Sequence, residues 1–289
     1  MEDMLKLQTP VTIPPLPVRI SYGDRIMVLG SCFAEETGRQ LAETGFDVCA
    51  NPFGPLYNPV SLSNAIARLS SGTPFGEEDC IEIGAGDGRI CSFSHHTSFA
   101  RDTTAAFLEE ANRSLEAASA FWKDCNKVLV TLGTSWCFRH NQSGETVANC
   151  LKRPGGEFTR YFLPLKTTAT LLEGLLRRNP EKAFLFTVSP IRHLADGAHA
   201  NQLSKASLLL AIDSVLSGNR AAYFPAYEIM MDELRDYRWW AEDMVHPSPL
   251  AARYIWERFI DAALPDEERD LFESRCKAAR AARHIPMKG

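Results

Sequence analysis

Ser31 is the strongest candidate nucleophile in this chain of 289 residues. It follows the apolar run 25–29 and Gly30, and a helical pattern begins shortly after it. A serine in such a strand-to-helix turn exposes its hydroxyl, and the first free N–H groups of the helix point at any oxyanion formed there. The same Gly-Ser pair could instead only close a tight turn or cap the helix. The adjacent Cys32 is a second possible nucleophile, although cysteine often simply fills a core.

A serine nucleophile needs a general base, and histidine is the usual one because its unperturbed pKa of about 6.5 lies near working pH. Two of the seven histidines, His199 and His246, have an aspartate three residues earlier, Asp196 and Asp243. This spacing lets a carboxylate on the same turn orient the imidazole. Position favours Asp243 and His246, which follow the last predicted strand and precede a helix. The other pair lies in a glycine-containing loop that is typical of a turn.

The hydrophobic pattern predicts the elements that must position these side chains. Short apolar runs ending in turn residues indicate five buried strands, with crossover helices between them. The strands are expected at 25–29, 46–49, 127–132, 183–188 and 221–224. The helices are expected at about 34–44, 60–69, 102–122, with Asp102 as N-cap, 165–178, 202–216 and 249–263, followed by a charged helix to His284. A doubly wound, three-layer α/β/α fold is the simplest arrangement of these elements.

Two further segments interrupt this alternation of strands and helices, and their sequences predict inserted hairpins. One joins the runs 80–83 and 89–93 through a glycine-rich turn, and the other lies around 142–144. We assign the whole chain, 1–289, to one domain. Its parts are a core at about 20–264, inserts at about 71–100 and 135–160, and a helical extension at 265–289.

The composition, 45% apolar and 23% charged with a net charge of -5, is that of an ordinary globular protein. Acidic and basic residues are interspersed without a basic stripe, so no nucleic-acid partner is expected. The longest apolar run, 208–212, is far shorter than the ~20 residues of a membrane-spanning helix, and residues 1–6 lack the features of a leader. We therefore expect a cytoplasmic protein without a membrane partner. The eight cysteines form no C-x-x-C pattern, which argues against disulfides and a zinc site.

In open parallel sheets, ligands bind beyond the carboxyl ends of the strands, so the polar residues after each run are candidate site residues. Arg192 and His193 could hold an anionic group or a sugar hydroxyl, or could pair with Asp196. The adjacent His95 and His96 could line a substrate mouth, whereas packing is the alternative, and a shared metal is not expected. Trp239 and Trp240 could stack on a sugar ring or close a core. The possible substrate-binding residues are thus Asn51, Asn58, His95, His96, Arg192 and His193.

The motifs together resemble the GSCFA family, a branch of the SGNH (GDSL-like) hydrolase superfamily. Residues 30–34 are the five-letter signature that names the family. Further matches follow in order at 51–54, 57–59, 131–134, 189–193 and 243–247, so that the resemblance spans about residues 20–260. It implies a flavodoxin-like parallel sheet of strand order 2-1-3-4-5, with Ser31 as the nucleophile and Asp243 and His246 completing the triad.

The superfamily builds its oxyanion hole from the nucleophile's own N–H, a glycine N–H after strand two and an asparagine side chain after strand three. Ser31 and Gly54 match the first two. The chain departs from the third, because Thr134 and Ser135 follow Gly133 where the pattern has Gly-x-Asn. Losing one oxyanion donor can lower a rate ~10²–10³-fold. The open alternatives are that Thr134 or Ser135 substitutes, that Asn58 or Asn51 swings in, or that the protein is a weak catalyst.

These residues predict a serine esterase that removes an acyl group from a small or carbohydrate-linked ester through an acyl-enzyme. The reaction uses side chains only, so no metal and no organic cofactor is expected. An O-acyltransferase with the same triad is the alternative within enzymes. A binding protein on a degenerate hydrolase fold is the alternative from another class, motivated by the missing asparagine.

Overall fold

The computed structural model describes residues 9–84, 86–216, 218 and 220–283. Its centre is a parallel sheet of five strands in the order β10-β9-β5-β1-β2. The strands are β1 (Arg25–Gly30), β2 (Asp47–Ala50), β5 (Lys127–Leu132), β9 (Ala183–Val188) and β10 (Ala221–Phe224). Counted along the chain, this is the predicted order 2-1-3-4-5, and each strand lies within one or two residues of its predicted bounds.

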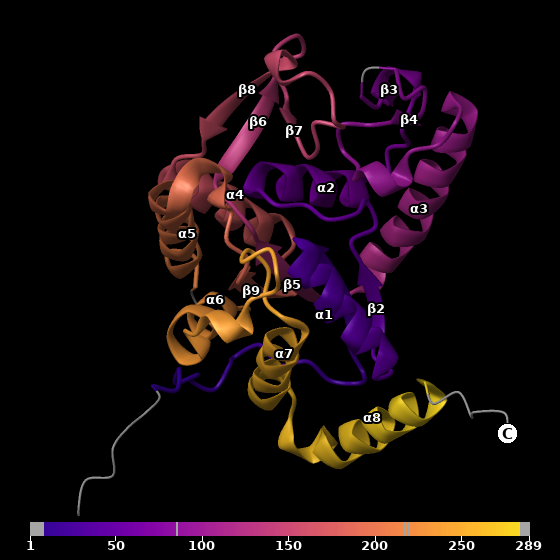
Figure 1. Ribbon diagram of the computed structural model, residues 1–289. Helices are drawn as coiled ribbons and strands as arrows, with labels where there is room; N and C mark the ends of the chain where they lie inside the picture. Colours follow the sequence, from indigo (N-terminus) through magenta and orange to yellow (C-terminus); the bar gives the residue numbers. More distant parts are fainter. Residues whose placement is uncertain (1–8, 85, 217, 219, 284–289) are drawn as a thin grey trace, which may run out of the picture.

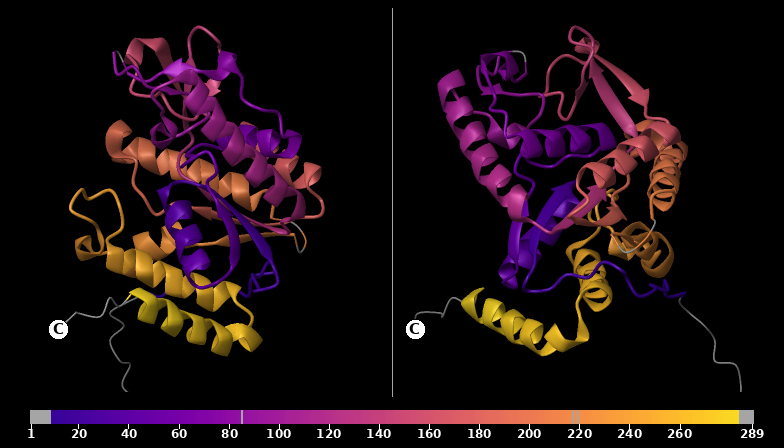
Figure 2. Two further views of the ribbon diagram at one scale, coloured as in Figure 1. Left: turned by 90° about the vertical axis from the view of Figure 1, so that its right-hand side faces the viewer. Right: turned by 180° about the vertical axis from the view of Figure 1, so that it is seen from behind.

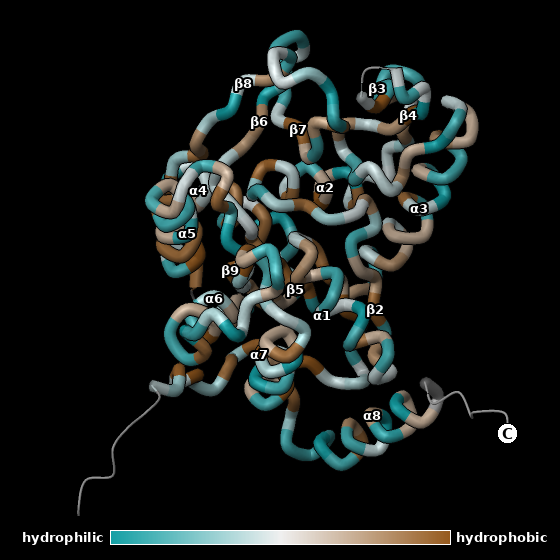
Figure 3. Tube along the Cα trace, in the orientation of Figure 1, coloured by the Kyte–Doolittle hydropathy of each residue, from teal (hydrophilic) through white to brown (hydrophobic). Residues whose placement is uncertain are grey.

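Helices cover both faces of this sheet, which confirms the predicted three layers (Figures 1 and 2). One face packs against α1 (Cys32–Glu43) and α7 (Pro249–Ala263). The other packs against α2 (Pro59–Ser71), α3 (Thr104–Asp124), α4 (Leu165–Arg178) and α5 (Gly197–Asp213). The side chains of β1 alternate accordingly: Val28 faces α1 and α7, whereas Leu29 faces the other layer. Figure 3 shows the hydrophobic residues gathered on the central strands.

Local sequence sets where the helices begin. Asn58 and Ser248 cap α2 and α7, and each is followed by a proline, whose missing N–H is not needed in the first turn. The N-cap of α3 is Thr103, which accepts the N–H of Ala106, so the prediction of Asp102 is wrong by one residue. Helix α5 begins about five residues earlier than predicted, because a short 3₁₀ turn at Leu194–Asp196 leads directly into it.

Both predicted inserts contain antiparallel strands. β3 (Ile81–Glu82) pairs with β4 (Ile90–Cys91), which confirms the first hairpin. β6 (Trp136–His140) pairs with β7 (Thr146–Val147), which confirms the second, and β6 also pairs with β8 (Phe158–Phe162), which was not predicted. In Figure 1 these strands lie above α2, on the opposite side of the molecule from α7.

The last helix, α8 (Arg269–Arg283), is largely hydrophilic (Figure 3). It docks through Arg275, whose guanidinium donates to the carbonyl of Gly45 and lies 4.4 Å from the centre of the Tyr22 ring. Its predicted last residue, His284, lies outside the described residues, as do residues 1–6. Among the helices that the structure describes, none has both the length and the apolar character needed to cross a membrane.

Candidate active site

Ser31 lies in the tight turn between β1 and α1. It is the N-cap of α1, where its Oγ accepts the N–H of Phe33 at 3.3 Å. Its own N–H donates to the carbonyl of Thr131 at 3.3 Å. Gly30, with φ of 143°, permits this close approach, since a Cβ there would collide with the Thr131 oxygen. The hydroxyl of Ser31 is therefore buried and capping, and the expected exposure is not found.

Asp243 and His246 form a hydrogen-bonded pair on an exposed turn. Asp243 Oδ2 lies 2.6 Å from His246 Nδ1, and Asp243 Oδ1 accepts the N–H groups of Val245 and His246, both at 2.9 Å. The backbone N–H groups of His246 and Val245, followed by the imidazole, lower the pKa of Asp243 to about 2. The carboxylate is thus ionised at neutral pH and fixes the orientation of the ring.

Arg192 anchors this turn to the loop that follows β9. Its N–H donates to the carbonyl of Val245 at 3.0 Å, and its guanidinium donates to the carbonyl of Met244. The same guanidinium lies 4.0 Å from the centre of the Trp240 ring, so this face of the indole is covered. Arg192 does not pair with Asp196, which instead forms an ion pair with Arg160.

No hydrogen bond joins Ser31 Oγ to His246 in the part of the chain that the structure describes. His193, in the loop after β9, lies close enough to His246 for the two imidazoles to interact electrostatically. Burial first, and then the charges of Lys205, His246 and Arg160, lower the pKa of His193 to about 3. Its buried Nε2 has no hydrogen-bond partner among the described atoms and lies 3.4 Å from the position that a Cβ on Gly133 would take.

A buried polar stripe on α5 holds the loops at this edge of the sheet. Lys205 Nζ donates to the carbonyls of Gly133 and Ser189, at 2.7 and 2.8 Å. Asn201 Oδ1 accepts the N–H of His193 at 2.9 Å. Burial lowers the pKa of Lys205 to about 7. The sequence pattern does not predict these residues, since its only signal is a set of polar side chains within an otherwise apolar helix.

Thr134 and Ser135, two expected oxyanion donors, face this stripe. Thr134 Oγ1 lies 3.0 Å from Ser204 Oγ, and Ser135 Oγ donates to the carbonyl of Ser204 at 3.1 Å. Gly54, a third expected donor, directs its N–H to the carbonyl of Asn51 at 2.7 Å. In this structure, all of these donors are therefore engaged within the chain.

The two asparagines of the loop after β2 have different environments. Asn58 Oδ1 accepts the N–H of Ser61 at 2.9 Å and so serves as the cap of α2. Asn51 Oδ1 accepts the N–H of Gly30 at 2.8 Å, beside the candidate nucleophile. Asn51 Nδ2 is buried and has no partner among the described atoms.

His95 and His96 lie in different surroundings. His95 is fully buried, its Nδ1 lies 2.7 Å from Ser92 Oγ, and burial lowers its pKa to about 3. The rings around it are Phe53, Phe75, Phe99 and Phe107. His96 packs directly against Gly54, where a Cβ would collide with it. His95 is thus a core residue, whereas His96 borders the loop after β2.

The structure also shows the surroundings of Cys32 and His199, the competing candidates for nucleophile and base. The Sγ of Cys32, which is partly exposed, lies 3.2 Å from the hydroxyl of Tyr57. His199 is exposed, and no hydrogen bond joins it to Asp196 in the described ranges. The described residues contain no group of three or more His, Cys, Asp or Glu side chains placed to hold a metal ion.

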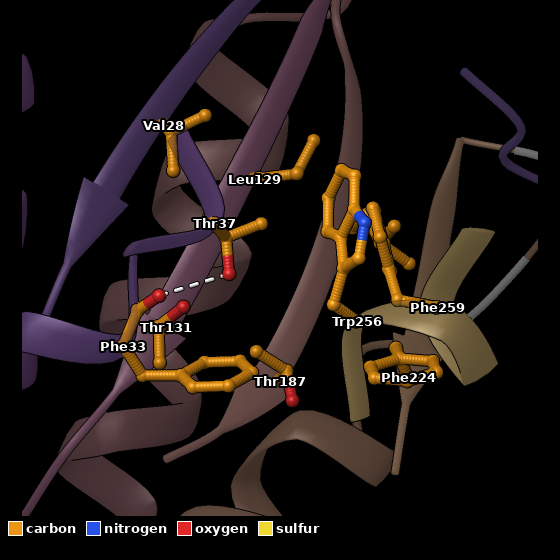
Figure 4. Close-up of a pocket in the computed structure, with 10 residues that line it drawn as sticks. Val28, Phe33, Thr37, Leu129, Thr131, Thr187, Phe224, Trp256 and Phe259 are labelled. Carbon is orange, nitrogen blue, oxygen red and sulfur yellow. Dashed lines mark hydrogen bonds between the residues drawn. The ribbon is translucent and has the colours of Figure 1, made fainter. Parts of the chain in front are cut away.

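A small apolar cavity lies next to the Ser31 turn, between the sheet, α1 and α7 (Figure 4). Its volume of about 20 Å³ is room for about one water molecule. Phe33 and Thr131 line it from the side of the turn, and Trp256 and Phe259 line it from α7. Its walls are nearly all apolar, but a cavity of this size does not accommodate a long acyl chain.

The sequence matches the model of the GSCFA family over residues 25–259, a range that includes Ser31, Asp243 and His246. Comparison with curated proteins and with solved structures finds no match.

Proposed function

The chain belongs to the GSCFA family, and from this premise we propose that it is a serine hydrolase of the SGNH type. Its reaction is the removal of an acyl group from a small or carbohydrate-linked ester through an acyl-enzyme. The observation that carries the proposal is the pair of Asp243 and His246, in which an ionised carboxylate holds one imidazole nitrogen at 2.6 Å. The position of Ser31, between a parallel strand and the N-terminus of a helix, supports its role as nucleophile.

Each residue has a defined role in the proposed reaction. Asp243 holds His246 with Nδ1 protonated, so that Nε2 is the base. Ser31 Oγ attacks the acyl carbon and loses its proton to Nε2, while the carbonyl π pair moves onto oxygen. When the tetrahedral intermediate collapses, the bond from carbon to the alcohol oxygen breaks, and His246 returns the proton to that oxygen. Water then repeats the sequence, which regenerates Ser31 and releases the acid.

The proposed reaction requires a conformational change around Ser31 and His246. Ser31 is fully buried in this structure, so its hydroxyl must become accessible, and His246 Nε2 must come within hydrogen-bond distance of it. His246 lies on an exposed turn that Arg192 holds through two hydrogen bonds to the carbonyls of Val245 and Met244. Displacement of this turn is the simplest way to complete the triad.

The burial of Ser31 favours one other candidate function, a binding protein on a hydrolase fold. In that case, the Ser31 hydroxyl only caps α1, as it does in this structure. An O-acyltransferase differs from the esterase only in the acceptor, because an alcohol then takes the place of water in the second step. Product analysis with and without a polyol acceptor distinguishes transfer from hydrolysis.

The decisive experiment is treatment with a fluorophosphonate probe followed by mass spectrometry. We expect a single adduct on Ser31, loss of this adduct in Ser31→Ala and much slower labelling in His246→Ala. His199→Ala, which changes an exposed histidine, is the matched control and should label like the wild type. No adduct, or an adduct on Cys32, would contradict the proposal.

A further inference from the structure

We propose that the side-chain amide of Asn51 is a donor of the oxyanion hole. It would take the place of the asparagine that the SGNH pattern expects after the third strand, where this chain has Ser135. The inference rests on the proposed function, since it assigns a role at the same site.

The position of the amide is fixed by one hydrogen bond. Asn51 is 8% exposed, and its Oδ1 accepts the N–H of Gly30 at 2.8 Å. Because a backbone N–H can only donate, the oxygen of the amide must face Gly30, and this determines where Nδ2 lies. Gly30 directly precedes Ser31, so the N–H₂ group is held beside the turn of the candidate nucleophile.

Asn51 Nδ2 is a buried donor that has no hydrogen-bond partner among the described atoms. Leaving such a group unpaired is unfavourable, and native proteins rarely do so without a reason. The backbone of the same residue is fully paired, because its N–H donates to Val28 and its carbonyl accepts from Gly54. Its φ of 42° lies in the left-handed region, which asparagine tolerates better than most residues. Unpaired and strained features of this kind cluster at functional sites.

The other expected donors are already engaged. The N–H of Ser31 donates to Thr131, that of Gly54 donates to Asn51, and the hydroxyls of Thr134 and Ser135 contact Ser204. Four other buried side-chain nitrogens lack a partner among the described atoms: His95 Nε2 in the core, Trp136 Nε1 on β6, and Arg192 Nε and His193 Nε2 in the loop after β9. However, β2 neighbours β1 in the sheet, whereas β9 is two strands away from β1. The loop that carries Asn51 is therefore the nearer of the two to Ser31.

The chemical role follows from the charge that develops in the reaction. The carbonyl oxygen of the ester becomes negative as Ser31 attacks, and a fixed N–H donor in a buried site stabilises that charge without reorganising. An amide is neutral at every working pH. It therefore adds a donor without adding a charge that would disturb the pair of Asp243 and His246.

The test compares two variants of Asn51 with one control. Asn51→Asp preserves the size of the side chain and an acceptor for Gly30, but removes the donor. Asn51→Gly removes the side chain and suits the positive φ. Asn64→Asp makes the same chemical change on the exposed side of α2. The rate of fluorophosphonate labelling at Ser31 is measured for each, together with kcat and KM for p-nitrophenyl acetate and the Tm.

We expect labelling and kcat to fall ~10²–10³-fold in both Asn51 variants, with KM nearly unchanged and Asn64→Asp at the wild-type level. A structural role alone would lower Tm without this selective loss of kcat. If Asn51→Asp does not fold, the labelling rate and kcat of Asn51→Gly test the inference. Wild-type rates in a folded Asn51 variant would overturn the inference and leave the proposed function standing. No labelling of Ser31 in the wild type would overturn the proposed function itself.

Discussion

Asp243 binds His246 through both of its carboxylate oxygens, one on the ring nitrogen and one on the backbone N–H. The backbone contact closes a turn in which Met244 has a φ of 57°. The turn and the imidazole orientation are therefore set by the same side chain. A substitution of Asp243 is expected to disturb both.

Asp243→Asn should lower the rate of ester hydrolysis ~10⁴-fold, because the neutral amide no longer selects the productive imidazole tautomer. Glu242→Gln is the matched control, since it removes an adjacent exposed carboxylate. The pKa of Asp243, at about 2, lies below its usual value, so Asp243 stays ionised throughout the working range. Protonation of Asp243 should consequently not cause the loss of rate at low pH. Equal rates for Asp243→Asn and Glu242→Gln would contradict the role of Asp243.

Arg192→Ala should loosen the turn that carries His246. The variant loses the guanidinium contacts with Met244 and Trp240, but keeps the backbone hydrogen bond to Val245. We expect faster hydrogen exchange at 241–247 and a stability loss of ~1–2 kcal/mol, which combines an exposed cation–π contact with one hydrogen bond. Unchanged exchange in this segment would show that other contacts hold it.

Lys205→Met should destabilise the protein by ~1–3 kcal/mol at neutral pH, because it leaves the buried carbonyls of Gly133 and Ser189 without a donor. The pKa of Lys205 is lowered from 10.5 to about 7, so between these values the unfolded chain binds a proton that the folded chain does not. The contribution of Lys205 to stability should therefore rise from about pH 7 to pH 10.5. Denaturant unfolding of both proteins across this range measures it, and parallel pH curves would refute the assignment.

His95→Phe should reduce the sensitivity of the fold to acid. The pKa of His95 lies at about 3 in the folded protein, against 6.5 for the free side chain. As the pH falls from 6.5 to 3, only the unfolded chain takes up this proton, and stability declines by up to ~1.4 kcal/mol per pH unit. Phenylalanine preserves the contacts with the surrounding rings and does not titrate. Thermal unfolding at pH 4 and pH 7 should show a smaller difference in the variant, and an equal difference would count against the buried neutral histidine.

The sequence predicted the sheet and the family well, for a physical reason. Buried parallel strands are nearly continuous apolar runs. The residues that follow them lie at the same edge of the sheet, regardless of the length and conformation of the loops. This reasoning predicts Ser31, Asn51, Thr134 and Arg192 at that edge.

What the sequence could not predict depends on contacts between distant segments. The burial of Ser31 requires the carbonyl of Thr131, and the engagement of Thr134 and Ser135 requires Ser204 on a helix of the next layer. Likewise, Asp102 and Thr103 are both good caps by residue type, and only the structure identifies Thr103 as the one that caps α3. The assignment to one domain, the cytoplasmic location and the link to SGNH hydrolases stay predictions.

The polar stripe of α5 has a mechanical consequence. Lys205 fastens the ends of β5 and β9 to one helix, and Asn201 fastens the following loop to the same helix. The ends of β5 and β9 and the loop after β9 are thus expected to move only together with α5, so this side of the site is rigid. Access to Ser31 is therefore expected from the side of the exposed turn at 241–247, which Arg192 contacts through the carbonyls of Val245 and Met244.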